Sequence, residues 1–243
     1  MTGTRWFFAP PQAWESDTVL LSPEESRHLA RVLRLPIGAE VVVTDGAGRA
    51  AKARVAGQER DRVRLQLVAE YSARTESPLA LTLAVGQAKG EALDRVVELA
   101  TELGAWELVA FASRYAEALP PERQARRLAR WERLAREALK LCRRARLPRL
   151  AVSDFESLLT RPEEVRILFY EEERGGLRPV GLPPRPAGVL LIIGPEGGFA
   201  PEEVNLAREA GLVVAGLGPR RLRVETAAAA ALGLAQFLWG DLT

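Results

Sequence analysis

The sequence predicts an α/β protein in which a small β-rich domain precedes a larger domain built on a parallel sheet. After residue 78, short apolar runs alternate with amphipathic segments, which is the order of a parallel sheet covered by helices on both faces. Between residues 37 and 69, apolar residues recur instead at every second position, as in half-exposed strands. We therefore expect one domain at residues 1–72 and a second at residues 73–243, with a polar linker around residues 71–78.

The first domain is expected to form a small β-barrel or a curled sheet with one short helix. Ser22 and Pro23 are the N-cap and the first residue of a helix that runs to about residue 33. Glu25 stands at the position that completes a capping box with Ser22. Strands are predicted at residues 40–44, 50–55 and 62–68.

Three arginines recur at helical spacing on this first helix and form a basic stripe, Arg27, Arg31 and Arg34, with His28 beside it. No acid follows Glu25 in the helix, so nothing within it offsets the positive charge. We expect this face to contact phosphate groups. An ordinary solvated charged face is the alternative.

Arginine supplies nearly all of the positive charge, since Lys52, Lys89 and Lys140 are the only lysines of a chain with a formal net charge of +2. An arginine-rich surface suits nucleic acid, because the planar guanidinium makes bidentate contacts to phosphate. Heat adaptation or genome composition would produce the same bias. Near the N-terminus, Arg5 precedes aromatic residues that either stack on bases or anchor the terminus to its domain.

The second domain is expected to alternate strands with helices. Predicted strands occupy residues 79–85, 108–111, 166–170, 189–193 and 212–217, and predicted helices occupy residues 91–103, 121–146, 201–210 and 224–239. Gly104 and Gly211 are expected to stop the helices that they follow.

The predicted long helix at residues 121–146 is the most charged element. Its basic residues are Arg123, Arg126, Arg127, Arg130, Arg133, Arg136, Lys140, Arg143, Arg144 and Arg146, against the acids Glu122, Glu132 and Glu137. A helix with charges of one sign repels itself unless an anion lies nearby. The pattern therefore favours a nucleic-acid partner over an ordinary surface.

A glycine-rich turn, Gly194-Pro195-Glu196-Gly197-Gly198, follows the wholly apolar strand at residues 189–193. The turn lacks the Gly-Lys-Ser/Thr ending of a phosphate-binding loop and the G-x-G-x-x-G order of a dinucleotide site. Glu196 stands where a triphosphate site would carry a cation. We therefore expect a neutral or cationic ligand, with a purely structural turn as the alternative.

A second stretch, residues 217–226, repeats this order of apolar strand, Gly-Pro turn and helix start. Its turn carries Arg220, Arg221 and Arg223. In an open α/β sheet, turns at the carboxyl ends of strands bind ligands. We expect the two turns, which follow neighbouring strands, to form two walls of one pocket.

Composition argues against several functional classes. A single cysteine excludes an internal disulfide, and one cysteine with one histidine leaves little for a zinc site or a Ser-His triad, so no metal is expected. Neither a signal peptide nor an apolar run of membrane-spanning length is found, which predicts a cytoplasmic protein without membrane contact. A nicotinamide-dependent enzyme is disfavoured because its glycine fingerprint is missing.

Two long motifs resemble the RsmE family, the small-subunit rRNA uracil-N3 methyltransferases. They are Ile-Gly-Pro-Glu-Gly-Gly-Phe at residues 193–199 and Leu-Gly-Pro-Arg-Arg-Leu-Arg-Val-Glu-Thr at residues 217–226. Shorter segments extend the resemblance along nearly the whole chain: Arg5-Trp-Phe, His28 to Arg34, Asp45-Gly46, Lys89-Gly90 and Ala100 to Gly104.

The resemblance implies an N-terminal PUA-like β-barrel that binds RNA and a C-terminal SPOUT-class methyltransferase domain with a trefoil knot. It also implies a homodimer that binds S-adenosylmethionine and acts on 16S rRNA, within the small ribosomal subunit. The cofactor residues implied are Phe169, Tyr170, Gly194, Pro195, Glu196, Gly197, Gly198, Leu217, Gly218, Arg220, Leu222 and Thr226. The candidate RNA-binding residues are Arg5, Arg27, His28, Arg31, Arg34, Arg114 and Arg144.

The implied reaction fits the charges of the two turns. The methyl donor is a sulfonium cation, which tolerates Glu196 nearby. Uracil N3 must lose its proton before or during attack on the methyl group. Arg220 or Arg223 can stabilise the resulting charge on O2 and O4, and Glu225 is the only acid of that loop, so we expect Arg223 and Glu225 to be catalytic. A structural pair of Arg223 with Glu225 is the alternative.

Two other functions stay open at this point, a ribose 2′-O-methyltransferase of the same superfamily and a non-enzymatic RNA-binding protein. The sequence departs from the family pattern at Val224, where Thr is commoner, at Ser113, where Glu is usual, and at Lys140-Leu141, where Glu-Gln is common. Both cofactor stretches are otherwise intact. The departures therefore bear on RNA contacts more than on methyl transfer.

Overall fold

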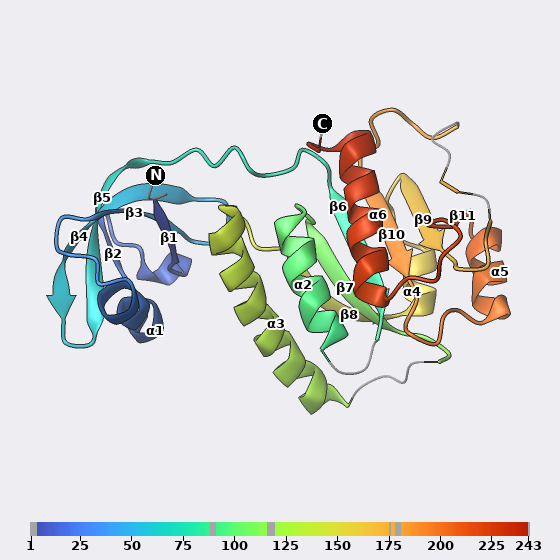
Figure 1. The fold of residues 1–243 in the computed structure, drawn as a ribbon, viewed down its shortest axis with the longest axis horizontal. Helices are drawn as coiled ribbons and strands as arrows, with labels where there is room; N and C mark the ends of the chain where they lie inside the picture. The colour runs from blue at the N-terminus through green and yellow to red at the C-terminus, as the bar shows by residue number, and fades with distance from the viewer. Residues whose placement is uncertain (1–3, 88–90, 116–119, 175, 178–180, 243) are drawn as a thin grey trace. The chain divides into compact units, whose positions relative to one another are not determined.

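The computed structural model describes residues 4–242 apart from residues 88–90, 116–119, 175 and 178–180 (Figure 1). The Lys89-Gly90 segment of the family resemblance lies outside the described residues. The chain divides into two compact units, Met1–Glu76 with Arg136–Leu147, and Ser77–Ala135 with Pro148–Thr243. Residues 136–147, which the sequence assigned to the second domain, thus belong to the first unit.

The first unit contains a five-stranded sheet with the strand order β1-β3-β4-β5-β2. Its strands are β1 (Arg5–Phe8), β2 (Thr18–Leu20), β3 (Glu40–Thr44), β4 (Ala50–Glu59) and β5 (Arg62–Glu70). Strands β1 and β3 are parallel, and the other neighbours are antiparallel. The three predicted strands are confirmed, whereas β1 and β2 were not predicted.

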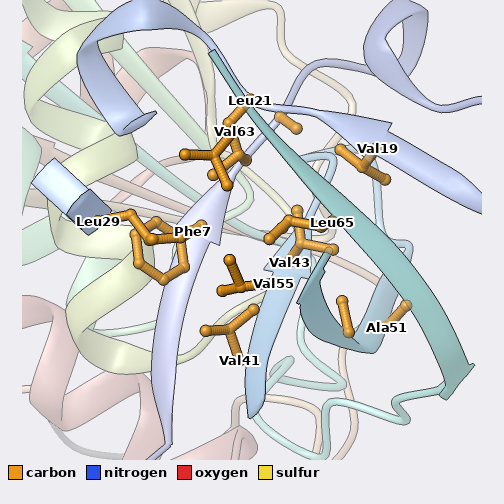
Figure 2. Close-up of a cluster of buried hydrophobic side chains, with 12 residues drawn as sticks. Phe7, Val19, Leu21, Leu29, Val41, Val43, Ala51, Val55, Val63 and Leu65 are labelled. Atoms are coloured by element: carbon orange, nitrogen blue, oxygen red, sulfur yellow. The ribbon is translucent and has the colours of Figure 1, made fainter. Parts of the chain in front are cut away.

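Alternate side chains of this sheet fill the core of the first unit. Val41 and Val43 of β3 pack with Val63 and Leu65 of β5 around Phe7 of β1 (Figure 2). Because successive residues of a strand point to opposite faces, Trp6 and Val42 lie on the other face, in a smaller cluster with Ala50 and Ala145.

The predicted first helix consists of α1 (Pro23–Arg27) followed by a π-helical turn (His28–Val32), and a short 3₁₀ helix (Pro11–Ala13) precedes it. The N-cap is confirmed, since the Ser22 hydroxyl accepts a hydrogen bond from the Glu25 amide at 3.2 Å. The other half of the capping box is wrong. The Glu25 carboxylate accepts instead from the Phe8 amide, at 3.2 Å, and from Lys140 Nζ, at 2.5 Å, because both are buried donors that need a partner.

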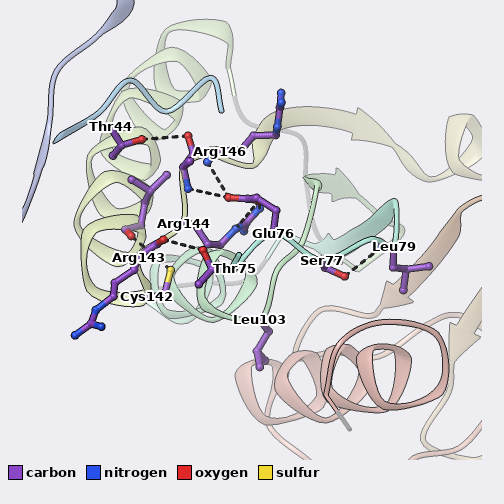
Figure 3. A network of polar contacts seen from close by, with 12 residues as sticks. Thr44, Thr75, Glu76, Ser77, Leu79, Leu103, Cys142, Arg143, Arg144 and Arg146 are labelled. Carbon is purple, nitrogen blue, oxygen red and sulfur yellow. Dashed lines mark hydrogen bonds and ion pairs between the residues drawn. The ribbon is translucent and has the colours of Figure 1, made fainter. Parts of the chain in front are cut away.

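A carboxylate at the end of the linker explains why residues 136–147 belong to the first unit. Glu76 accepts hydrogen bonds from the Arg144 guanidinium, at 2.9 and 3.1 Å, and from the amides of Ala145 and Arg146, at 2.8 and 2.9 Å (Figure 3). Next to it, the Thr75 hydroxyl donates to the Arg143 carbonyl oxygen at 2.7 Å. These hydrogen bonds join the linker to the segment at the end of the long helix.

The second unit contains a six-stranded sheet with the order β11-β9-β10-β6-β7-β8, in which every neighbouring pair is parallel. Its strands are β6 (Leu81–Gly86), β7 (Glu107–Ala112), β8 (Arg149–Asp154), β9 (Val165–Phe169), β10 (Val189–Ile193) and β11 (Val213–Ala215). The predicted parallel sheet is confirmed, although β8 was not predicted.

Helices cover both faces of this sheet. On one face, α6 (Val224–Trp239) packs on β6 and β10, and α2 (Ala92–Glu102) lies beside α6 (Figure 1). On the other, α4 (Phe155–Leu159), which was not predicted, and α5 (Pro201–Glu209) pack on Leu190 and Ile192. The long helix α3 (Pro121–Cys142) begins in this unit and ends in the first.

Candidate functional site

Three strands of the second unit end at the same level of the sheet. Phe169, the last residue of β9, is in register with Ile193 at the end of β10 and with Ala215 at the end of β11. The loops that follow therefore leave the sheet side by side. The prediction that the two Gly-Pro turns follow neighbouring strands is wrong. Strand β9 lies between β10 and β11, and its own loop lies between the two turns.

These loops surround a cavity of about 560 Å³. The predicted cofactor residues that line it are Phe169, Tyr170, Gly194, Pro195, Glu196, Leu217, Gly218, Arg220 and Leu222, and both predicted catalytic residues, Arg223 and Glu225, line it as well. Gly197, Gly198 and Thr226 are not among the lining residues. The two Gly-Pro turns thus form parts of one cavity, and the individual contacts to a cofactor stay predictions.

Further lining residues were not among the predicted cofactor or catalytic residues: Ala92, Glu171, Ile193, Arg221, Val224 and Ala227. Glu171 comes two residues after the end of β9, so the rule that ligands bind at the carboxyl ends of parallel strands could have found it. Ala92 belongs to α2, and no local pattern in the sequence connects it with residues more than a hundred positions away.

The residues that line the cavity carry charges of both signs, namely Glu171, Glu196 and Glu225 and the arginines Arg220, Arg221 and Arg223. Arg221, in the loop after β11, contacts the other two loops, since its Nη2 donates to the Glu196 carbonyl oxygen at 3.4 Å and lies 3.9 Å from Glu171 Oε1. Such a lining suits a ligand that itself carries positive and negative groups.

Glycine is required at two positions beside this cavity, since Gly198 and Gly218 have φ angles of +75° and +96°. A Cβ at Gly198 would collide with the Glu171 carboxylate, whereas a Cβ at Gly218 would meet nothing within 4 Å. At Gly194, a Cβ would touch the Phe199 ring at 3.0 Å. The first turn is therefore closely packed, and the second leaves open space.

The two predicted catalytic residues lie at the start of α6. Arg223 is the N-cap residue, its carbonyl oxygen accepts from the Ala227 amide at 2.8 Å, and its side chain is exposed. Glu225 is half-buried in the first helical turn. Within the described part of the chain, no ion pair joins Arg223 to Glu225, so the structure does not support the alternative of a structural pair. Their catalytic roles stay predictions.

The candidate RNA-binding residues fall into two groups. Arg5, Arg27, His28, Arg31 and Arg34 are all exposed on the first unit, and their RNA contacts stay predictions.

The two remaining candidates are engaged with acids. Arg114 is exposed and lies 3.4 Å from Glu202. Arg144 has only 2% of its surface exposed and pairs with Glu76 at 2.9 Å. This buried position argues against an RNA contact by Arg144.

The positive charge of α3 is partly offset by acids from distant segments. Arg130 pairs with Asp94 at 2.5 Å, and Lys140 pairs with Glu25. Burial lowers the pKa of the Lys140 ammonium. The hydrogen bonds to Glu137 and Glu25, together with the negative charges of these two residues, raise the pKa by more than burial lowers it. The pKa therefore lies above its ordinary value. In the folded protein, acids from other segments therefore neutralise part of the positive charge of α3. This weakens the prediction of a nucleic-acid partner that was based on the charge of this helix.

The described residues contain neither a metal site nor a membrane-spanning helix. No group of three or more His, Cys, Asp or Glu side chains is placed to hold a metal ion. None of the helices in the described ranges combines the length and apolar character needed to cross a membrane.

A parallel α/β unit with a ligand cavity at the carboxyl edge of its sheet, joined to a small β unit, is an arrangement shared with RNA methyltransferases. The family model of the RNA methyltransferase domain matches residues 75–236, and the model of the RNA methyltransferase PUA domain matches residues 21–68.

Curated relatives narrow this class. Ribosomal RNA small subunit methyltransferase E of Bacillus subtilis is 30% identical over 226 residues, covering 89% of this chain and 88% of the relative. The protein of that name from Mycobacterium bovis is 35% identical, covering 86% and 82%. The chain belongs to the ribosomal RNA small subunit methyltransferase E family, which confirms the resemblance seen in the sequence.

Solved structures of two methyltransferases share the fold of nearly the whole chain. A methyltransferase of Legionella pneumophila in complex with bound S-adenosylmethionine has a TM-score of 0.90 at 28% identity, covering 99% of this chain and all of that one. Ribosomal RNA small subunit methyltransferase E of Neisseria gonorrhoeae, bound to S-adenosylmethionine, has a TM-score of 0.87 at 31% identity with the same coverage. The α/β fold with a parallel sheet and a PUA-like domain is thereby confirmed.

Proposed function

We propose that this protein transfers a methyl group from S-adenosylmethionine to N3 of a uridine in 16S rRNA, in the cytoplasm. The observation that carries the proposal is the cavity at the ends of β9, β10 and β11, bounded by the motifs at residues 193–199 and 217–226. Membership of the family and the S-adenosylmethionine complexes of two relatives support it.

The cavity fits this cofactor in size and in chemistry. Its volume lies within the roughly 300–1,000 Å³ of ordinary ligand pockets. S-adenosylmethionine carries a carboxylate, an ammonium and a sulfonium, and the cavity presents Glu171 and Glu196 together with Arg220 and Arg221. Phe169, Ile193 and Val224 supply apolar surface for the adenine. When bound, the cofactor supplies an electrophilic methyl group.

The remaining steps depend on side chains of this protein. In this proposal the Arg223 guanidinium, which is exposed where α6 begins, stabilises negative charge on uracil O2 or O4. Glu225, in the first turn of α6, takes the N3 proton. Glu171 and Glu196 favour a cationic donor, because their negative charges attract a positive group that lies nearby.

We further infer that the cofactor loops belong to a trefoil knot and that the protein is a homodimer. The turn after β10 is packed against the end of β6, since a Cβ on Gly86 would overlap Pro195. Helix α6 exposes Leu234 by 39% and Phe237 by 67%, which is unusual for apolar side chains and favours a partner surface.

The activity is tested with small ribosomal subunits from cells that lack this enzyme. After incubation with protein and S-adenosylmethionine, the rRNA is digested and its nucleosides are identified by mass spectrometry. N3-methyluridine is expected. A ribose methyl would instead identify a 2′-O-methyltransferase, and absence of cofactor binding in calorimetry would favour a non-enzymatic RNA-binding protein.

The catalytic assignment is tested with Arg223→Ala. Removing one stabilising donor is expected to lower kcat by about 10²–10³ and to leave the cofactor Kd unchanged. Arg185→Ala is the matched control, because Arg185 is exposed in the same unit and does not line the cavity. Full turnover by Arg223→Ala would remove Arg223 from the mechanism.

A further inference from the structure

A second, smaller cavity lies in the first unit. Its volume is about 150 Å³, and its lining includes Trp6, Val42, Lys52, Tyr71 and Arg143. It lies on the face of the five-stranded sheet opposite the Phe7 core, where Trp6 and Val42 form their own apolar cluster. None of its residues lines the large cavity of the second unit.

The inner part of this small cavity is aromatic. The rings of Trp6 and Tyr71 meet edge to face, with centroids 5.3 Å apart and planes at 88°. Trp6 is nearly buried, at 8% exposure, whereas Tyr71 is half-buried. The pair is thus held in place by packing and still forms part of a surface that is open to solvent.

Two cations stand at the cavity without an acidic partner. Among the described residues, neither Lys52 nor Arg143 forms an ion pair, and both are exposed. The one acid of the lining, Glu40, is paired with Arg54 at 3.1 Å. The cavity therefore attracts anions.

Arg143 is held in an unusual conformation. Its φ of +63° lies in the left-handed region, which arginine rarely adopts, at a helix end where glycine or asparagine is usual. The hydrogen bond from Thr75 to its carbonyl oxygen holds the backbone there, and its guanidinium extends away from that contact (Figure 3). Strained residues of this kind cluster at ligand sites.

We propose that this cavity holds one unstacked nucleobase of a single-stranded RNA segment, with the adjoining phosphates on Lys52 and Arg143. Its volume is well below the roughly 300–1,000 Å³ of sites for whole ligands, so it takes one ring system. Aromatic side chains beside unpaired cations are the means by which proteins hold unpaired bases. The proposal rests on the proposed function for its partner, RNA, and assigns a site that methyl transfer itself does not require.

The test uses the full-length protein and a single-stranded RNA of about 8 nucleotides, a length within the site size of single-strand binders. Fluorescence anisotropy gives the Kd over a series of salt concentrations. Lys52→Glu is expected to weaken binding and to reduce the slope of log K against log salt by about 0.7 for the lost phosphate contact. Arg60→Glu is the matched control, because Arg60 is exposed on the turn between β4 and β5 and does not line the cavity.

The aromatic part is tested separately with Tyr71→Ala, which is expected to raise the Kd about 5- to 150-fold with the salt slope unchanged, since a stacked base contributes about 1–3 kcal/mol. Thermal unfolding checks that Tyr71→Ala folds. If Tyr71→Ala does not fold, Lys52→Glu still tests the proposed site, because Lys52 is exposed. RNA that contains 4-thiouridine is expected to crosslink to peptides containing Trp6 or Tyr71.

Equal losses from Lys52→Glu and Arg60→Glu would overturn the proposal, and so would crosslinks confined to the Arg27–Arg34 face. The assay needs neither the methyl donor nor turnover. A protein that binds through the cavity but methylates no rRNA refutes only the proposed function. If the wild-type protein methylates rRNA and the Lys52→Glu variant binds RNA as tightly as the wild type, only the base site is refuted.

Discussion

Gly198→Ala tests whether the turn after β10 has the backbone geometry described above. The substitution adds one methyl group at a φ of +75°. A residue with a Cβ in this left-handed region costs roughly 1–2 kcal/mol. The new Cβ would also overlap the Glu171 carboxylate, which must rotate away. We therefore expect the free energy of unfolding to fall by about 1–3 kcal/mol.

Thermal unfolding measures this loss. For a unit of this size, each kcal/mol lowers Tm by about 2–4 °C, so a decrease of about 2–12 °C is expected. Gly218→Ala is the control, because its φ of +96° imposes backbone strain while the space around its Cβ is open. Calorimetry with S-adenosylmethionine is expected to show weaker binding for Gly198→Ala, because the displaced Glu171 lines the cavity.

A double-mutant cycle separates the two contributions. In a Glu171→Ala background, Gly198→Ala is expected to cost only the backbone term, so the difference between the two backgrounds is expected to be a coupling energy of about 0.5–1 kcal/mol. The reasoning is refuted if Gly198→Ala changes stability by less than about 0.5 kcal/mol, the usual range of neutral substitutions. An identical cost with and without Glu171 would refute the steric part alone.

Three further predictions concern stability and assembly. Lys140→Met is expected to lower the free energy of unfolding by up to about 3–5 kcal/mol in chemical denaturation, because Glu25 would be left buried without its cation, and adding Glu25→Gln is expected to recover part of the loss. Burial raises the pKa of Glu163, but hydrogen bonds from Arg161, from a backbone amide and from Thr82, together with the charge of Arg161, lower it to below the ordinary 4.5. Its contribution to stability is therefore present at neutral pH and disappears as the pH falls through this lowered pKa. The stability difference between wild type and Glu163→Gln is thus expected to vanish in acid, and a constant difference would contradict this. Phe237→Glu is expected to convert a dimer to monomers in analytical ultracentrifugation, and a wild-type protein that sediments as a monomer would rule out the α6 interface.

Local patterns in the sequence predicted the centre of the fold better than its edges. The apolar run of β10 and the two Gly-Pro turns could be recognised because burial on both faces removes every polar residue from a strand. Strand β8 was missed because it lies at the edge of the sheet, pairs only with β7, and contains only a short apolar run between the exposed residues Arg149 and Asp154. Strand β1 was missed because its three consecutive aromatic residues conceal the alternation.

The charged residues were harder to place, because their partners are distant in sequence. Arg144 was a candidate for RNA contact on the basis of the arginines around it, yet its partner Glu76 lies 68 positions earlier. Glu25 fitted a capping box, yet its carboxylate binds Lys140, 115 positions later. A sequence shows how many charges a segment carries, and only the folded chain shows which of them are already paired.

The division of the first unit between two separate stretches of chain sets an order of events during protein synthesis. Glu25 and Glu76 are made long before Lys140 and Arg144, so both carboxylates must wait for their cations while more than sixty further residues are added. Domains usually mature from the N-terminus as the chain emerges. Here the N-terminal sheet cannot complete its polar contacts until about residue 147, and a fragment that ends at residue 76 would lack those cations permanently.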